Sequence, residues 1–138
     1  MQYWLCKSEP NVFSWDDHVK KKIEGWHGVR NYAARNNLRA MKKGDLSFFY
    51  HSNIGLEIVG IMEVVKEAYP DPTDETGKFD QVDFKALKPL KRPVTLKQIK
   101  ATPALADMAL IRLSRLSVGP VTKKEWDKII EMSEKNSK

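Results

Sequence analysis

The sequence has a single cysteine, Cys6, no long apolar run and no recognisable cofactor or metal motif. A lone cysteine cannot form an internal disulfide, which is typical of a reducing compartment. No apolar stretch approaches the roughly 20 residues that span a bilayer. The opening residues, MQYWLCKSEP, lack the charged and apolar regions of a secretory signal. We therefore expect no membrane partner and a cytoplasmic location, or a nuclear one in a eukaryote.

Residues that serve common catalytic and metal sites are also scarce. His18, His27, His51 and Cys6 have no metal-ligand spacing. The seven glycines form no phosphate-binding loop, and there is no nucleophile elbow. A hydrolytic set can be assembled from Ser8, His51 and a distant aspartate, but any chain of this length offers one. We predict no metal, no cofactor and no enzymatic activity, with Cys6 buried and inert.

The sequence has fewer acidic residues than basic ones. The 24 lysines and arginines outnumber the 18 acids, which gives a formal charge of +6. Basic side chains that contact phosphates release bound counterions, so this bias favours polyanionic partners. A protein with many solvated surface lysines has the same composition, and residues 20–22 read as such a face. The charge alone leaves both interpretations open.

The 138 residues predict one domain, spanning 1–138, with strands and short helices interspersed. Strand patterns cover residues 2–7, 46–52, 56–68, 82–90 and 109–118. Helical patterns cover residues 15–23 and 30–41, and two more begin at the capping pairs Thr95/Gln98 and Thr122/Glu125. Residues 69–78, YPDPTDETGK, predict an exposed loop. Regular strand–helix alternation is absent, so we predict an α+β domain around a curved sheet or small barrel.

Three polar clusters adjoin apolar segments and predict a binding pocket. They are Lys7 to Pro10 at a strand end, residues 26–36, and residues 50–52 at another strand end. Trp26 offers a stacking face, and the polar residues among them could read the edge of a base: Ser8, Asn31, Asn36, His51 and Ser52. The basic residues Lys7, Arg30, Arg35 and Arg115 could reach phosphates.

Structural roles compete with these assignments. We expect Trp4, Trp15 and Trp126 to be core residues, whereas Trp26 lies in a loop between two glycines. His51 fits a hydrogen-bonded core histidine at least as well as a ligand-binding one.

The stretches KSEP, GVRNYAARN and FYHS together resemble the EVE-domain family, which is related to YTH and ASCH domains. The resemblance implies a PUA-like fold, a small curved β-barrel of about five or six strands with flanking short helices. It also implies a module that binds a modified base in DNA or RNA, a modified cytosine or a methylated adenine. The implied base pocket contains Lys7, Ser8, Trp26, Val29, Asn31, Asn36, His51, Ser52 and Phe79, with phosphate contacts from Arg30, Arg35 and Arg115.

One position departs from the family pattern. Phe79 stands where the family usually has a tryptophan, so a cage closed by Phe79 would have a smaller stacking face. We expect a monomer that takes a flipped base into the pocket. The alternatives are a nucleotide-derivative binder or hydrolase that uses the same pocket with His51 as acid or base, and a protein-interaction module.

Overall fold

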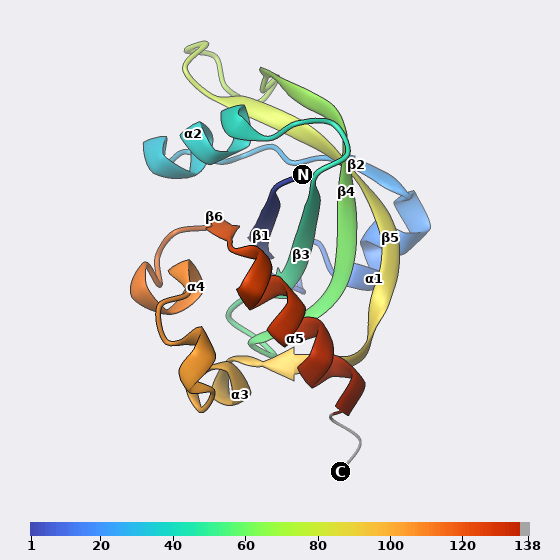
Figure 1. The fold of residues 1–138 in the computed structure, drawn as a ribbon. Helices are drawn as coiled ribbons and strands as arrows, with labels where there is room; N and C mark the ends of the chain where they lie inside the picture. The colour runs from blue at the N-terminus through green and yellow to red at the C-terminus, as the bar shows by residue number, and fades with distance from the viewer. Residues whose placement is uncertain (136–138) are drawn as a thin grey trace.

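The computed structural model describes residues 1–135. Its strands are β1 (Tyr3–Ser8), β2 (Ile23–Gly25), β3 (Leu46–His51), β4 (Glu57–Pro70), β5 (Asp80–Thr95) and β6 (Val118–Val121). Its helices are α1 (Trp15–Lys21), α2 (Tyr32–Ala40), α3 (Leu96–Lys100), a 3₁₀ turn at Pro103–Leu105, α4 (Ala109–Arg112) and α5 (Lys123–Lys135) (Figure 1).

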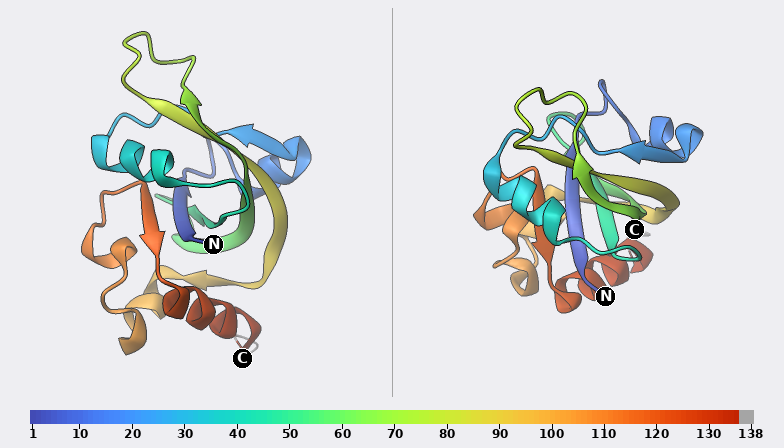
Figure 2. Two further views of the ribbon diagram at one scale, coloured as in Figure 1. Left: turned by 45° about the horizontal axis from the view of Figure 1, so that its top comes forward. Right: turned by 90° about the horizontal axis from the view of Figure 1, so that it is seen from above.

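The strands form one mixed sheet in the order β2-β5-β4-β3-β1-β6. β1 and β3 pair in parallel, and the other neighbouring strands pair antiparallel. The long β4–β5 pair carries several register shifts, which increase the local twist, and the two strands curl around the molecule (Figure 2). Within residues 1–135 β2 and β6 do not pair, so the sheet is curled and open. The predicted α+β class and curved sheet are confirmed.

Two apolar clusters cover the two faces of this sheet. Side chains alternate along each strand, so Cys6 and Phe49 join one cluster while Leu5 and Phe48 join the other. Helices α1 and α2 pack on the first cluster, and α3, α4 and α5 pack on the second. The predicted core roles of Trp4, Trp15 and Trp126 are confirmed, as is the exposed lysine face at 20–22.

The predicted capping residues are in place. The Ser14 hydroxyl accepts the backbone N–H of Asp17, and the Asp17 carboxylate accepts that of Ser14. Thr95 and Gln98 form the same reciprocal pair, as do Thr122 and Glu125. Each pair satisfies two backbone donors that would otherwise lack partners at the start of a helix.

The prediction of a strand at 109–118 was wrong. Residues 109–112 form α4, residues 113–117 form a turn, and β6 begins only at Val118. The alternating leucines of ALIRLSRLSV suited a strand, but only Leu110 of α4 is buried, and Leu113 is 55% exposed. The three-residue strand β2 was missed because so short a segment carries no period.

Strand β5 also extends past Pro89, where the sequence predicted that it would end near residue 90. Pro89 lies opposite Gly60, beside a register shift, where a residue without an N–H is tolerated. A Cβ on Gly60 would lie 2.6 Å from Trp15 ring carbons, so glycine lets α1 pack directly on β4. No helix within residues 1–135 is long and apolar enough to cross a membrane.

Candidate functional site

The site lies where β1 and β3 end. Because these neighbours run parallel, their carboxyl ends reach the same edge, with Ser8 opposite His51. The Ser52 backbone N–H donates to the Ser8 carbonyl at 2.9 Å. A cavity of about 460 Å³ opens at this edge. The structure therefore brings Lys7, Ser8 and Ser52, which the sequence placed at two strand ends, into the lining of one cavity.

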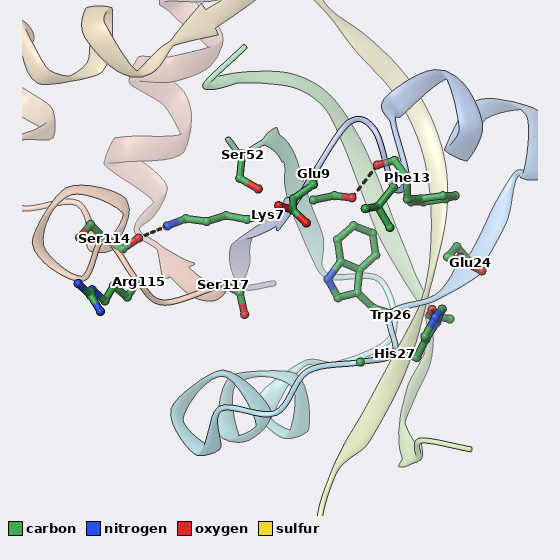
Figure 3. Close-up of a pocket in the computed structure, with 14 residues that line it drawn as sticks. Lys7, Glu9, Phe13, Glu24, Trp26, His27, Ser52, Ser114, Arg115 and Ser117 are labelled. Carbon is green, nitrogen blue, oxygen red and sulfur yellow. Dashed lines mark hydrogen bonds between the residues drawn. The ribbon is translucent and has the colours of Figure 1, made fainter. Parts of the chain in front are cut away.

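The cavity is lined by four parts of the chain (Figure 3). They are residues 7–9 with 12 and 13, residues 24–28, residue 52, and residues 114, 115 and 117. The last part reaches the cavity because the Lys7 backbone N–H donates to the Ser117 carbonyl at 2.9 Å. Trp26 and Arg115 were predicted for this site, whereas Phe13 and Glu24 were not. Glu9 was predicted only as part of the cluster from Lys7 to Pro10, without a role of its own.

Trp26 forms a rigid wall of the cavity. Its ring is only 8% exposed and makes edge-to-face contacts with Phe49 and Phe84, each at 5.6 Å between centroids. The backbone N–H of Trp26 donates to the Val82 carbonyl at 2.8 Å. Trp26 is thus both a core residue and a lining residue, so a ligand would meet an indole that is already fixed in place.

One side of the cavity is rich in hydrogen-bond acceptors. The Ser8 hydroxyl donates its single hydrogen to the Phe13 carbonyl at 2.6 Å, so it can offer a ligand only its lone pairs. Glu9 and Glu24 also line the cavity, but the Glu24 carboxylate already accepts the Lys21 ammonium at 2.6 Å. Glu9 accepts a hydrogen bond from Asn53, which orients it. A ligand that fits this side presents N–H donors.

The other side is cationic. The Lys7 ammonium donates to the Ser114 carbonyl at 2.7 Å, and burial lowers the pKa of this amine. Arg115 lies beside it at the rim, and its guanidinium has no hydrogen-bond or ion-pair partner among the residues that the structure describes (Figure 3). Arg115 is therefore available to an anion.

The other two arginines expected to contact phosphate are already engaged. Arg30 donates to the Asp71 carboxylate at 3.1 Å and to the Thr73 hydroxyl at 3.0 Å. Arg35 donates to Asn36 Oδ1 at 2.8 Å and to the Lys78 carbonyl at 3.1 Å. Neither residue lines the cavity.

Asp71 joins Arg30 to the Trp26 loop, because its carboxylate also accepts the Gly28 N–H at 2.7 Å. Burial alone would raise the pKa of Asp71, but hydrogen bonds from Thr73, Gly28 and Arg30 together hold that pKa below its usual value. The carboxylate that fixes this loop therefore stays ionised.

Four further residues expected in the pocket lie outside its lining. Val29 is buried in the core cluster. Asn31 caps α2 by accepting the Ala34 N–H at 2.9 Å, and Asn36 holds Arg35. His51 Nε2 accepts the Trp15 N–H at 3.1 Å, which fits the structural role weighed for it.

Phe79 also lies outside the lining. Its ring stacks on Tyr32, with 5.2 Å between centroids, and the Arg30 guanidinium lies over it at 5.4 Å. The structure therefore does not place a second aromatic face at this position opposite Trp26.

His18 supports the pocket wall from behind. It is fully buried among Phe13, Trp15, Trp26 and Phe49, and both ring nitrogens lack hydrogen-bond partners in residues 1–135. Burial lowers the pKa of His18 to about 4. The native imidazole is therefore neutral near neutral pH and acts as an aromatic packing group.

This burial predicts acid sensitivity. The unfolded chain binds a proton at His18 from about pH 6.5 downward, whereas the native state does so only near pH 4. Stability should therefore fall through that window, by at most about 1.4 kcal/mol per pH unit from this group. Urea unfolding at about pH 7 and about pH 5 should show a smaller loss in His18→Phe than in the wild type. Equal losses in the two proteins would contradict this assignment.

No group of three or more metal-ligating side chains is positioned to hold a metal ion in residues 1–135. The cavity thus offers an indole wall, an acceptor side and a cationic rim. Together with the curled α+β sheet, these features define a small α+β domain with a candidate ligand-binding cavity at the ends of β1 and β3.

Comparison with known proteins identifies the family. The EVE domain model matches residues 2–132. Mouse thymocyte nuclear protein 1 is 40% identical, with 96% of this chain and 74% of that protein covered. The chain belongs to the EVE domain family.

Solved structures of related proteins have the same fold as this chain. The NMR structure of Rpa0253 from Rhodopseudomonas palustris is 58% identical, with a TM-score of 0.92 and 97% and 94% of the two chains covered. Human THYN1, in complex with DNA containing 5-methylcytosine, is 37% identical, with a TM-score of 0.91 and 98% and 99% covered. An ASCH protein from Zymomonas mobilis shares the fold at 12% identity, with a TM-score of 0.59 and 95% of each chain covered.

Proposed function

We propose that the cavity binds a modified cytosine that a DNA or RNA strand presents as a flipped-out base. The observation that carries this proposal is the acceptor side formed by Ser8 and Glu9 beside the fixed Trp26 ring. Cytosine presents an N4 amino donor on its pairing edge, and carboxylates are its usual protein acceptors. The human relative solved with 5-methylcytosine DNA supports the same choice. Arg115 takes a flanking phosphate.

Thymine is the sharpest competitor for this pocket. It has the same ring size and C5-methyl group as 5-methylcytosine but presents a carbonyl oxygen where cytosine has the amine. That oxygen would face the Ser8 and Glu9 acceptors without a hydrogen bond. A methylated adenine keeps at most one N6–H and is the second candidate from the family.

The test is fluorescence anisotropy with matched short oligonucleotides, single- and double-stranded, that carry cytosine, 5-methylcytosine, N6-methyladenine or thymine at one position. The buried methyl group should make 5-methylcytosine at least about fourfold tighter than cytosine. Thymine should bind about tenfold more weakly than 5-methylcytosine, because acceptors are left opposed. Equal affinities for 5-methylcytosine and thymine would overturn the proposal.

Arg115 provides a separable prediction. We expect Arg115→Ala to weaken all of these oligonucleotides alike, about fivefold to tenfold at low salt, and to reduce the salt slope by about one. The ratio between modified and unmodified cytosine should not change, since a phosphate contact carries no base information. Lys20→Ala, on the exposed lysine face of α1, is the matched charge control and should change affinity less. An Arg115→Ala protein with wild-type salt dependence would exclude the phosphate contact.

A free nucleotide that binds as tightly as an oligonucleotide, with no salt dependence, would instead favour a small-molecule ligand for the same cavity.

A further inference from the structure

A second cavity lies directly beside the first, across the turn that precedes β6. It measures about 420 Å³ and shares Ser114 and Arg115 with the first cavity. Its remaining lining comes from Arg112 at the end of α4, from Leu113 and Leu116 of the turn, and from Asn31 and Ala33 at the start of α2. The two cavities thus meet at a single wall, and the unpaired Arg115 stands in that wall.

The chemistry of the second cavity suits one nucleotide. Leu113 is 55% exposed, and with Ala33 and Leu116 it offers an apolar surface for the face of a base. The lining contains two arginines and no acid, so it attracts a phosphate-linked ligand. Asn31 uses its carbonyl oxygen to cap α2, and its amino group has no protein partner within residues 1–135. That group can donate to an acceptor on a base edge.

The separating turn is held in place before any ligand arrives. Ser114 accepts the Lys7 ammonium, and Ser117 accepts the Lys7 backbone N–H. Leu116 donates its N–H to the Leu113 carbonyl at 2.8 Å. These hydrogen bonds hold the turn, and with it the two cavities, in a fixed arrangement. A ligand that fills both cavities therefore pays little entropy to order the turn.

We propose that the second cavity binds the nucleotide next to the flipped base in the same strand, so that the protein reads a dinucleotide. Arg115 binds the phosphate that joins the two nucleotides, and Leu113 packs on the second base. The proposal rests on the proposed function, because the first cavity must hold the modified base. It adds a contact that a free nucleotide cannot make.

The experiment compares three ligands by anisotropy competition: the modified cytidine with one phosphate, and two dinucleotides that extend it on the 5′ or the 3′ side. We expect one of the two dinucleotides to bind about tenfold more tightly than the mononucleotide. Leu113→Ala should remove about fivefold of that gain and leave mononucleotide affinity unchanged. Leu87→Ala, which alters a leucine of β5 that is 44% exposed, is the control and should change neither affinity.

A second variant tests the charge of the cavity. Ala33→Glu places an acid in the first turn of α2, where an acid is compatible with the helix, so the fold should be retained. It should weaken the favoured dinucleotide more than the mononucleotide, because the carboxylate faces the second nucleotide.

The outcomes separate the two proposals. If modified mononucleotides bind selectively but neither dinucleotide gains affinity, or the gain survives Leu113→Ala intact, the second subsite is wrong and the base pocket stands. If mononucleotides and oligonucleotides show no preference for the modified base, both proposals are wrong.

Discussion

Replacing Trp26 with alanine should lower the free energy of unfolding by about 3–5 kcal/mol and remove the preference for a modified base. The stability loss follows from the position of the ring, which is 8% exposed and held edge-to-face against Phe49 and Phe84. The binding loss follows because the same ring lines the cavity. Urea unfolding measures the first effect, and anisotropy with cytosine and 5-methylcytosine oligonucleotides measures the second.

Two control variants separate stability from recognition at this wall. Trp126 is equally buried, but it stacks on Phe48 in the other core cluster, away from the cavity lining. Trp126→Ala should therefore cost a similar stability but leave the affinity of the folded fraction unchanged. Trp26→Phe keeps an aromatic ring, so it should lose less stability than alanine while still weakening the modified base. Full affinity and full preference in Trp26→Phe would show that the indole is not part of recognition.

Much of the candidate site could be predicted because its residues lie at strand ends that the sequence marks. KSEP follows an apolar strand, and FYHS closes another, so the polar groups at Ser8 and Ser52 had to lie at an edge of the sheet. The two strand ends lie side by side because β1 and β3 pair in parallel. No local sequence pattern shows this pairing.

The two arginines that fell outside the cavity have partners from distant parts of the chain. Arg30 is engaged by Asp71, 41 positions away, and Arg35 by the Lys78 carbonyl, 43 positions away. Both arginines were predicted to contact phosphate because they are basic and lie near Trp26 in the sequence. Neither property reveals that another part of the protein already binds the side chain. Phe79 was assigned through the family pattern, and its stacking on Tyr32 depends on how the loop at 71–79 folds over α2.

The turn at residues 113–117 shows a different limit. Alternating leucines predicted a strand, and a strand would have turned half of these side chains into the core. The structure instead leaves both side chains exposed: Arg115 lines both cavities, and Leu113 lines the second cavity alone. The incorrect strand prediction therefore left Leu113 without a predicted role, although Arg115 of the same segment was predicted to contact phosphate.

Asp45 controls the opposite end of the strands that form the site. It is only 3% exposed, and its carboxylate accepts the backbone N–H groups of Gln2 and Lys42 and the indole N–H of Trp4 at 3.0–3.1 Å. These bonds fix the start of β1 beside the start of β3, where the Leu46 N–H donates to the Gln2 carbonyl. The parallel register set there determines where Ser8 and Ser52 meet.

Asp45→Ala should therefore lower the free energy of unfolding by about 3–5 kcal/mol, because it leaves up to three donors without an acceptor at about 1–3 kcal/mol each. Asp45→Asn keeps one oxygen and should cost clearly less, since that oxygen can still serve Trp4 and Lys42. In Trp4→Phe, which lacks the indole donor, the further cost of Asp45→Ala should shrink by at least about 1 kcal/mol in a double-mutant cycle. Additive losses in that cycle would show that the indole bond to Asp45 does not help to set the β1–β3 register.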